Sequence, residues 1–198
     1  MDHGKKITDI FLDSIKAKKG FISDPANIKA VSTAADEIIK CFENGGKILV
    51  CGNGGSAADS QHLAAEFVVR FEKERKPLPC IALTADTSIL TAAANDYDYN
   101  AVFKKQIEAL ARPGDVLIAI STSGNSGNIL EGVRSARARG IPVIALTGKN
   151  GGKLLAEADI LLHVRENCTA RIQEIHITMI HVLCKLVEDY FCDDRKEN

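Results

Sequence analysis

Side chains that can move protons or bind a metal lie at two places in this 198-residue sequence. His62 and Glu66 are four residues apart in a helical pattern, so both fall on one helix face within reach of a common ligand. Such a pair can bind Zn²⁺ with an open position, or move protons next to a carbonyl group. A single histidine is more often a hydrogen-bonded structural residue, so spacing alone does not decide between these roles.

The second set interrupts the apolar pattern of the last helical segment, 169–191, at Gln173, Glu174, His176 and His181. His176 and His181 fall about 140° apart around a helix and do not share a face. Gln173 and His181 fall within about 80° of each other but roughly 12 Å apart along the axis. Both can contact one ion only if their side chains lean together or if a second chain supplies one of them.

A first loop rich in small residues comprises Gly52, Asn53, Gly54, Gly55 and Ser56, directly after an apolar run. Its glycines let the backbone turn N–H groups inward, and the following helix N-terminus adds partial positive charge. The loop is neither a dinucleotide-binding fingerprint nor a Walker A loop, since no Gly-Lys-Ser/Thr follows. An anionic ligand is favoured, and a dinucleotide or nucleoside triphosphate is disfavoured.

A second loop carries four hydroxyl groups within six residues, immediately before a predicted helix: Ser121, Thr122, Ser123 and Ser126. Hydroxyls and backbone amides together can surround a phosphate without a full countercharge, which suits a ligand that must be released. Helix capping explains one such hydroxyl but hardly four. The sequence therefore predicts a phosphate site in this loop, whereas a third loop, 147–152, needs no role beyond a turn.

Five short apolar runs alternate with helical patterns and must position these loops. The predicted strands are 47–52, 77–84, 115–120, 142–148 and 159–164. The helical patterns between them include one continuous helix over 89–110 and one over 149–158. Each run is apolar on both faces, which is typical of a buried parallel sheet with right-handed crossovers. The predicted fold is an α/β three-layer α/β/α sandwich with a five-stranded, flavodoxin-like parallel sheet. Ligands bind such sheets beyond the carboxyl ends of the strands.

Two amphipathic helices are predicted ahead of the first strand. The second covers 27–44, and the first places four apolar side chains on one face: Ile7, Ile10, Phe11 and Ile15. We divide the chain into an N-terminal helical arm, 1–45, and a ligand-binding domain, 46–198. The arm either supports self-association or covers the sheet of its own chain, and the sequence favours neither.

Composition and charge disfavour several classes of protein. A formal net charge of -1 and a pI near 6.5 give no support to a nucleic-acid binder. No apolar stretch reaches the roughly 20 residues that span a bilayer, and charges interrupt any signal-peptide core. The six cysteines include no CxxC pair, as expected of buried or incidental thiols in a reducing compartment. We expect a cytoplasmic protein without nucleic-acid or membrane partners.

These motifs together resemble the phosphoheptose isomerase family of the sugar isomerase (SIS) fold. The resemblance rests on CGNGGSAADSQHLAAEF, TSILTAAANDYDYN, ISTSGNSGNIL, TGKNGG and TARIQEIHITMIH, which occur in that order between about Lys47 and Phe191. It implies conversion of sedoheptulose 7-phosphate into glycero-manno-heptose 7-phosphate, the first step toward bacterial ADP- or GDP-heptose for lipopolysaccharide core or surface glycans. It also implies a homotetramer with active sites between subunits.

The resemblance further implies roles for individual residues. Substrate contacts fall to Asn53, Gly54, Gly55, Ser56, Glu66, Asn95, Asp96, Ser121, Thr122, Ser123, Ser126 and Gln173. One Zn²⁺ per subunit falls to His62, Glu66, Gln173 and His181, as in the metal-bound members. Some relatives carry an acidic residue directly before Arg-Ile-Gln, where this chain has Ala170, so a role for that acid does not carry over.

Ketose-to-aldose isomerisation moves a proton from C1 to C2 through an enediol. A carboxylate can take the C1 proton if burial raises its pKa toward neutrality, and a histidine can serve the oxygens. Glu66 is the expected base and His181 its acid–base partner, with zinc or the Asn and Gln dipoles polarising the carbonyl.

Other functions of the same fold remain alternatives. DnaA-binding initiator-associating proteins share the glycine-rich loop and self-associate, but such relatives generally lack the carboxylate that Glu66 provides. Sugar-phosphate-sensing regulators add a DNA-binding domain, for which no helix-turn-helix region is left here. Among isomerases, a pentose or hexose phosphate is an alternative substrate, because pocket shape sets the chain length.

Overall fold

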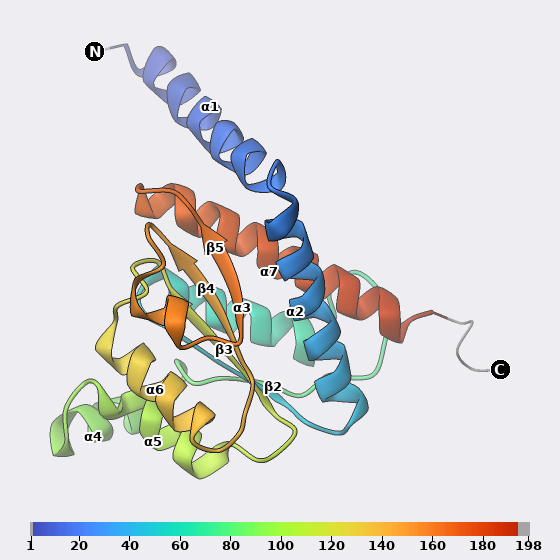
Figure 1. Ribbon diagram of the computed structural model, residues 1–198, viewed down its shortest axis with the longest axis vertical. Coiled ribbons are helices and arrows are strands. Elements are labelled where there is room, and N and C mark those ends of the chain that lie inside the picture. The colour runs from blue at the N-terminus through green and yellow to red at the C-terminus, as the bar shows by residue number, and fades with distance from the viewer. Residues whose placement is uncertain (1, 194–198) are drawn as a thin grey trace.

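A computed structural model describes residues 2–193 of the chain. The elements in chain order are α1 (His3–Ile22), α2 (Pro25–Glu43), β1 (Ile48–Gly52), α3 (Gly55–Val68), β2 (Cys80–Ala82), α4 (Thr87–Asp96), α5 (Ala101–Leu110), β3 (Val116–Ser121), α6 (Gly127–Arg137), β4 (Val143–Gly148), the 3₁₀ helix η1 (Gly152–Ala156), β5 (Ile160–Val164) and α7 (Thr169–Phe191). Figure 1 shows helices on both faces of the sheet.

The five strands form one parallel sheet in the order β2-β1-β3-β4-β5. This is the flavodoxin-like order, in which successive connections run in opposite directions away from the β1/β3 pair. The helices that follow β1 and β3 therefore lie on opposite faces of the sheet, and the loops that lead into them border a crevice. The predicted three-layer sandwich with a parallel sheet is confirmed.

Each face of the sheet has its own hydrophobic core, because successive strand residues point to opposite sides. Val50 and Ile118 pack into the core under α2, α3 and α7. Leu49 and Leu117 pack into the other core, under α4, α5 and α6. α3 and α7 thus lie on the same face of the sheet, which brings their side chains together.

Two predicted helices differ from those observed. The continuous helix expected over 89–110 is broken between α4 and α5, where Asp98 Oδ1 accepts a hydrogen bond from the backbone N–H of Asn100 at 2.6 Å. Such a side-chain turn competes with helical hydrogen bonding. The helix expected after β4 is only the 3₁₀ turn η1, because Gly151 and Gly152 adopt φ values of 81° and 58°.

The two N-terminal helices are covered to different extents. α2 buries Val31, Ala35 and Ile38 in the core that it shares with α7. α1 extends away from the body of the protein (Figure 1). It exposes a row of large apolar side chains: Ile7, Ile10, Phe11, Leu12 and Ile15. Arg171 of α7, which pairs with Glu174, joins the two helices by donating to the carbonyl oxygen of Ile10 at 2.7 Å.

Several cysteines lie in the core of the protein. Cys51, Cys80 and Cys184 are buried in β1, β2 and α7. Burial raises the pKa of the Cys51 thiol to about 12, so it stays protonated at neutral pH. Over residues 2–193, no helix has both the length and the apolar character that a membrane span requires.

Candidate active site

The two predicted anion-binding loops meet at one edge of the sheet. β1 and β3 pair in parallel, with Gly52 opposite Ile120, so the loops that follow them leave the sheet side by side. The first loop leads into α3 at Gly55, and the second leads into α6 at Gly127. Two helix N-termini therefore point toward this crevice, which favours an anionic ligand.

A pair of asparagine amides ties the two loops together. The Asn53 Nδ2 group donates to Asn128 Oδ1, and Asn128 Nδ2 donates back to Asn53 Oδ1, both at 2.8 Å. Asn128 is buried in the first turn of α6. Sequence reasoning missed Asn128, although its position two residues after the last hydroxyl of the second loop was a usable signal. The pair fixes the first loop against the phosphate loop.

The hydroxyl loop is closed by contacts of its own side chains. The hydroxyl oxygens of Ser121 and Ser126 lie 3.1 Å apart across the loop. The Ser123 hydroxyl accepts from the backbone N–H of Asn125 at 3.2 Å. The 3₁₀ helix η1, which follows the third loop, supports this one, because the Leu154 N–H donates to the carbonyl oxygen of Gly124 at 3.1 Å.

His62, Glu66 and His181 come together within one chain. The Nε2 atoms of His62 and His181 lie 3.1 Å apart, and His62 Nε2 lies 3.1 Å from Glu66 Oε1. The His62 side chain is 42% exposed and that of Glu66 is 24% exposed, so both are accessible to a ligand. The ring of Phe71 lies 5.7 Å from that of His181, centroid to centroid, and covers it.

Gln173 does not join this cluster. Its side chain lies at the start of α3, where a Cβ atom on Gly55 would lie 2.4 Å from Gln173 Nε2. His181 faces α3 two turns further on, opposite His62. The axial separation of Gln173 and His181 that the sequence predicted is therefore retained within one chain, and the two side chains do not lean together.

The side chains of the cluster suit zinc by type. Ligands at about 2.0–2.1 Å around a tetrahedral Zn²⁺ lie about 3.3 Å from one another. This spacing is close to the 3.1 Å contacts that His62 makes with Glu66 and with His181. Two imidazoles, a carboxylate and an amide are also nitrogen and oxygen donors that zinc accepts. Within residues 2–193, however, no three His, Cys, Asp or Glu side chains are arranged so that they could hold a metal ion. The donor chemistry fits, but the described chain does not assemble a closed site.

Asn95 and Asp96 lie apart from the loops. Both are exposed at the end of α4, where Asn95 Nδ2 donates to Asp96 Oδ1 at 2.9 Å. The connection that follows reaches the first loop through Tyr99, whose hydroxyl donates to Asn53 Oδ1 at 3.4 Å. Ala170 is exposed in the first turn of α7.

Sequence reasoning also missed Asp59. It lies three residues before His62 and seven before Glu66, so all three share one face of α3. Its Oδ2 atom is buried and, among the described residues, has no hydrogen-bond partner. Burial raises the pKa of the Asp59 carboxyl, and the nearby His62 lowers it by less. The sequence spacing of Asp59, His62 and Glu66 could have placed Asp59 beside the other two residues.

His176 has a structural environment instead. It is fully buried, and its Nε2 atom lies 3.1 Å from the carbonyl oxygen of Thr147 at the end of β4. Burial lowers the pKa of its imidazole to about 4, and the Thr147 contact raises it by less. His176 therefore stays neutral at pH 7 and fixes α7 against the sheet.

This lowered pKa predicts a pH dependence of stability. A depressed folded-state pKa contributes stability that is complete above the unfolded value, near 6.5, and is lost as pH falls through the folded value, near 4. The loss amounts to about 3 kcal/mol at most. Urea unfolding at pH 7 and pH 4 should show a smaller pH effect in His176→Gln than in the natural chain. An identical pH effect in both proteins would contradict the burial of a neutral imidazole.

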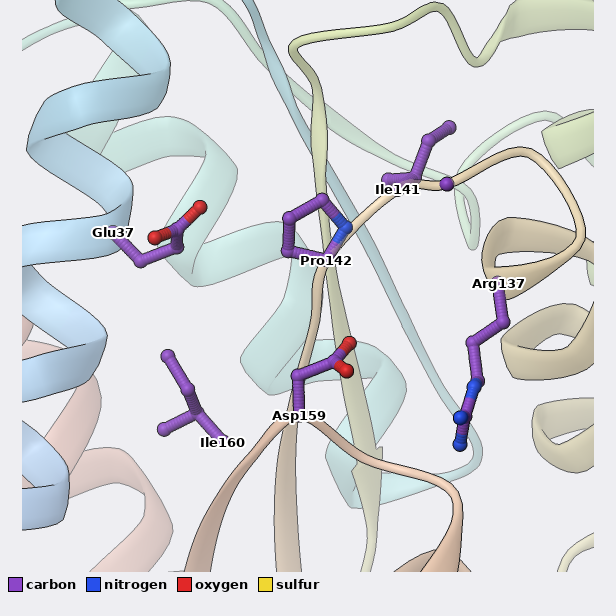
Figure 2. A pocket seen from close by; sticks show the side chains of 7 residues that line it. Glu37, Arg137, Ile141, Pro142, Asp159 and Ile160 are labelled. Carbon is purple, nitrogen blue, oxygen red and sulfur yellow. The ribbon is translucent and has the colours of Figure 1, made fainter.

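A separate cavity of about 460 Å³ lies at the other end of the sheet (Figure 2). It opens beside the start of β4 and β5, and its polar side chains include Glu37, Arg137 and Asp159. Asp159 accepts from the N–H of Val143 at 2.8 Å, and Arg137 donates to the carbonyl oxygen of Glu157 at 2.8 Å. Asp159 and Arg137 thus cap backbone atoms, and the loops rich in glycine and hydroxyl groups lie elsewhere, so this cavity is not the candidate site.

The fold and the loops define a class of phosphosugar-binding α/β proteins. Residues 11–148 match the SIS domain family. The phosphoheptose isomerase of Neisseria meningitidis serogroup C (strain 053442) is 51% identical over 187 residues, covering 93% of this chain and 94% of that protein. That of Roseiflexus sp. (strain RS-1) is 52% identical over 175 residues, covering 88% of each.

Solved structures of phosphoheptose isomerases have the same fold as this chain. The phosphoheptose isomerase from Neisseria gonorrhoeae superposes with a TM-score of 0.88 at 46% identity, covering 94% of this chain and 98% of that one. The enzyme from Francisella tularensis superposes with a TM-score of 0.90 at 42% identity, covering 96% and 100%. This chain belongs to the phosphoheptose isomerase family of SIS-domain proteins.

Proposed function

We propose that this chain interconverts sedoheptulose 7-phosphate and glycero-manno-heptose 7-phosphate, as the names of its relatives and the resemblance of its motifs indicate. The observation that carries the proposal is the convergence of Glu66, His62 and His181 within 3.1 Å contacts on the face of the sheet that also bears the glycine-rich loop. A carboxylate next to imidazoles can supply the proton transfers of aldose–ketose isomerisation.

In this mechanism Glu66 removes a proton from C1 of the ketose, giving an enediol. The same carboxyl returns that proton to C2, while His181 moves a proton from O1 to O2, so that the carbonyl group ends at C1. No redox cofactor is needed, because the hydrogen count of the sugar is unchanged. His62 contacts both the Glu66 carboxylate and the His181 imidazole and keeps them close to each other.

The hydroxyl loop binds the phosphate group of the substrate in this proposal. Ser121 and Ser126 face each other at the loop, and the N-terminus of α6 follows directly. Asn53, held by Asn128, presents the first loop to the sugar hydroxyls. Binding energy from the remote phosphate then orients C1 and C2 for proton transfer.

Zinc is a further part of the proposal. We infer that His62, Glu66, Gln173 and His181 would hold Zn²⁺, as the resemblance implies. This binding would need a rearrangement or a second chain, because no three His, Cys, Asp or Glu side chains of residues 2–193 are placed to hold an ion. When bound, the ion supplies Lewis-acid polarisation of the substrate oxygens. Support comes from the donor types and their separations.

Self-association and cytoplasmic location complete the proposal. The exposed apolar row on α1 and an adjoining groove between α1, α2 and α7, lined by Phe21, Met179 and Leu186 among others, favour a homo-oligomer, which the resemblance implies to be a tetramer. Buried, unpaired cysteines favour a reducing compartment. A DnaA-binding role is disfavoured, because such a role gives no reason for the contacts among Glu66, His62 and His181.

Turnover of sedoheptulose 7-phosphate by the purified protein tests this function, with fructose 6-phosphate as the control substrate. We expect conversion of the heptulose phosphate, a lower rate after chelation and recovery with added Zn²⁺. Equal turnover of fructose 6-phosphate would contradict the substrate assignment. Unchanged turnover after complete metal removal would contradict the zinc proposal, and no turnover in any condition would contradict the isomerase.

A further inference from the structure

A buried ion pair joins α7 to the segment that follows α3, near the cluster of His62, Glu66 and His181. The Arg75 side chain is 3% exposed and that of Glu188 is fully buried, with Arg75 Nε 3.4 Å from Glu188 Oε1. Replacing such pairs by apolar residues is often neutral or stabilising, because desolvating two charges is costly. A role in geometry explains the pair better than a role in stability.

Arg75 fixes the last turn of α3. Its Nη2 group donates to the carbonyl oxygen of Glu66 at 2.6 Å, and its Nη1 group donates to that of Phe67 at 2.8 Å. These carbonyls lie at the C-terminal end of the helix, where unpaired oxygens favour a cation. The guanidinium therefore binds the backbone of the residue proposed as the base.

Glu188 fixes the wall of the site. Its carboxylate accepts backbone N–H groups of Phe71, Glu72 and Lys73 at 2.9, 2.7 and 2.9 Å. Burial raises the pKa of Glu188, but these N–H groups and Arg75 together bring it below its usual range, so the side chain is ionised. The segment that it holds carries Phe71, whose ring covers His181.

The pair also connects the two catalytic helices. Glu188 follows His181 by seven residues, which places both on nearly the same face of α7. The buried Arg75–Glu188 pair thus joins the helix that carries His181 to the backbone of Glu66 at the end of α3. No part of it touches the hydroxyl loop, which lies at the other end of α3.

We propose that Arg75 and Glu188 are positioning residues for the isomerase site, holding the Glu66 end of α3 and the ring of Phe71 at a fixed distance from His181. This inference rests on the proposed function, since it assigns the pair to proton transfer. Misplacement of a catalytic group by about 1 Å can cost about 10²-fold in rate. Loss of the pair should therefore lower kcat and leave KM, set largely by the phosphate loop, nearly unchanged.

Glu188→Gln is the direct test, and Asp115→Asn is its matched control. Asp115 is also a buried carboxylate that accepts backbone N–H groups, from Lys47 at 3.0 Å and Arg112 at 2.7 Å, and pairs with a cation, Lys47 Nζ, at 2.6 Å. It lies at the amino end of β3, away from the site. Both variants should lower Tm, but only Glu188→Gln should lower kcat, by about 10- to 100-fold, with KM changed less than about threefold.

Arg75→Lys tests whether the geometry of the guanidinium matters in addition to its positive charge. It also provides the test if Glu188→Gln does not fold. Lysine keeps the positive charge but lacks the planar fork that reaches two carbonyl oxygens. We expect a lower kcat here too. An unchanged kcat in Arg75→Lys would overturn the proposal. A loss of kcat in Asp115→Asn as large as that in Glu188→Gln would also overturn it.

Amide hydrogen exchange makes the test independent of turnover. Glu188→Gln should speed exchange at residues 66–73, and Asp115→Asn should not, whatever reaction the protein catalyses. Unchanged exchange in Glu188→Gln would overturn the proposed positioning. Absence of turnover in the natural chain would instead contradict the proposed function, so the two failures are distinguishable.

Discussion

Glu66→Gln is expected to lower kcat by about 10²- to 10⁴-fold, the range that a general base contributes. Glutamine has the same shape and can still hydrogen-bond His62, which lies 3.1 Å from Glu66 Oε1. It cannot accept the C1 proton, so the enediol does not form. Solvent exchange of the C1 hydrogen, followed by NMR in deuterated buffer, measures this step directly and should be lost together with turnover.

Glu37→Gln is the matched control for this substitution. The Glu37 side chain is 25% exposed, compared with 24% for Glu66, and it lies on α2 beside the cavity at the opposite end of the sheet. The same chemical change there should leave kcat and C1 exchange unaffected. Binding of the substrate phosphate should be retained in both variants. A kcat for Glu66→Gln within a few-fold of that of Glu37→Gln would exclude Glu66 as the base.

The sheet was predictable because its strands are buried on both faces. The runs that contain β1, β3 and β4 are almost purely apolar, and this pattern fits few structures other than a central parallel strand. The break between α4 and α5 was not predictable from periodicity, because it involves a local hydrogen bond that the Asp98 carboxylate accepts from the N–H of Asn100. The residues on each side keep a helical pattern, so the apolar spacing carries no sign of the turn.

The candidate site was predictable only where its residues are close in sequence. His62 and Glu66 follow from four-residue spacing, and the hydroxyl loop follows from its composition. The contact of His62 with His181 joins residues 119 positions apart and depends on how α3 packs against α7. Arg75 and Glu188 were missed for the same reason, since each is an ordinary charged residue until the fold buries it.

Gly124→Ala is expected to raise the KM for the sugar phosphate by about 10- to 100-fold, the effect of losing one or two hydrogen bonds to a charged group. Gly124 adopts a φ of 64°, and a Cβ there would lie 1.9 Å from the carbonyl oxygen of Gly151. The three nearest atoms all belong to the backbone of Gly151 and Gly152, so no flexible side chain can move away. The hydroxyl loop must therefore shift from the third loop, and its phosphate-binding groups shift with it.

Gly140→Ala separates this effect from ordinary backbone strain. Gly140 has a φ of 67°, almost the same as that of Gly124, but no atom lies within 4 Å of its Cβ position. Alanine there should cost about 1–2 kcal/mol of unfolding free energy, the usual penalty of left-handed backbone, with KM unchanged. Gly124→Ala should lose more stability in urea unfolding as well as affinity. An unchanged KM in both variants would show that the hydroxyl loop does not bind the phosphate. Only the contact with Gly151 distinguishes the position of Gly124 from that of Gly140.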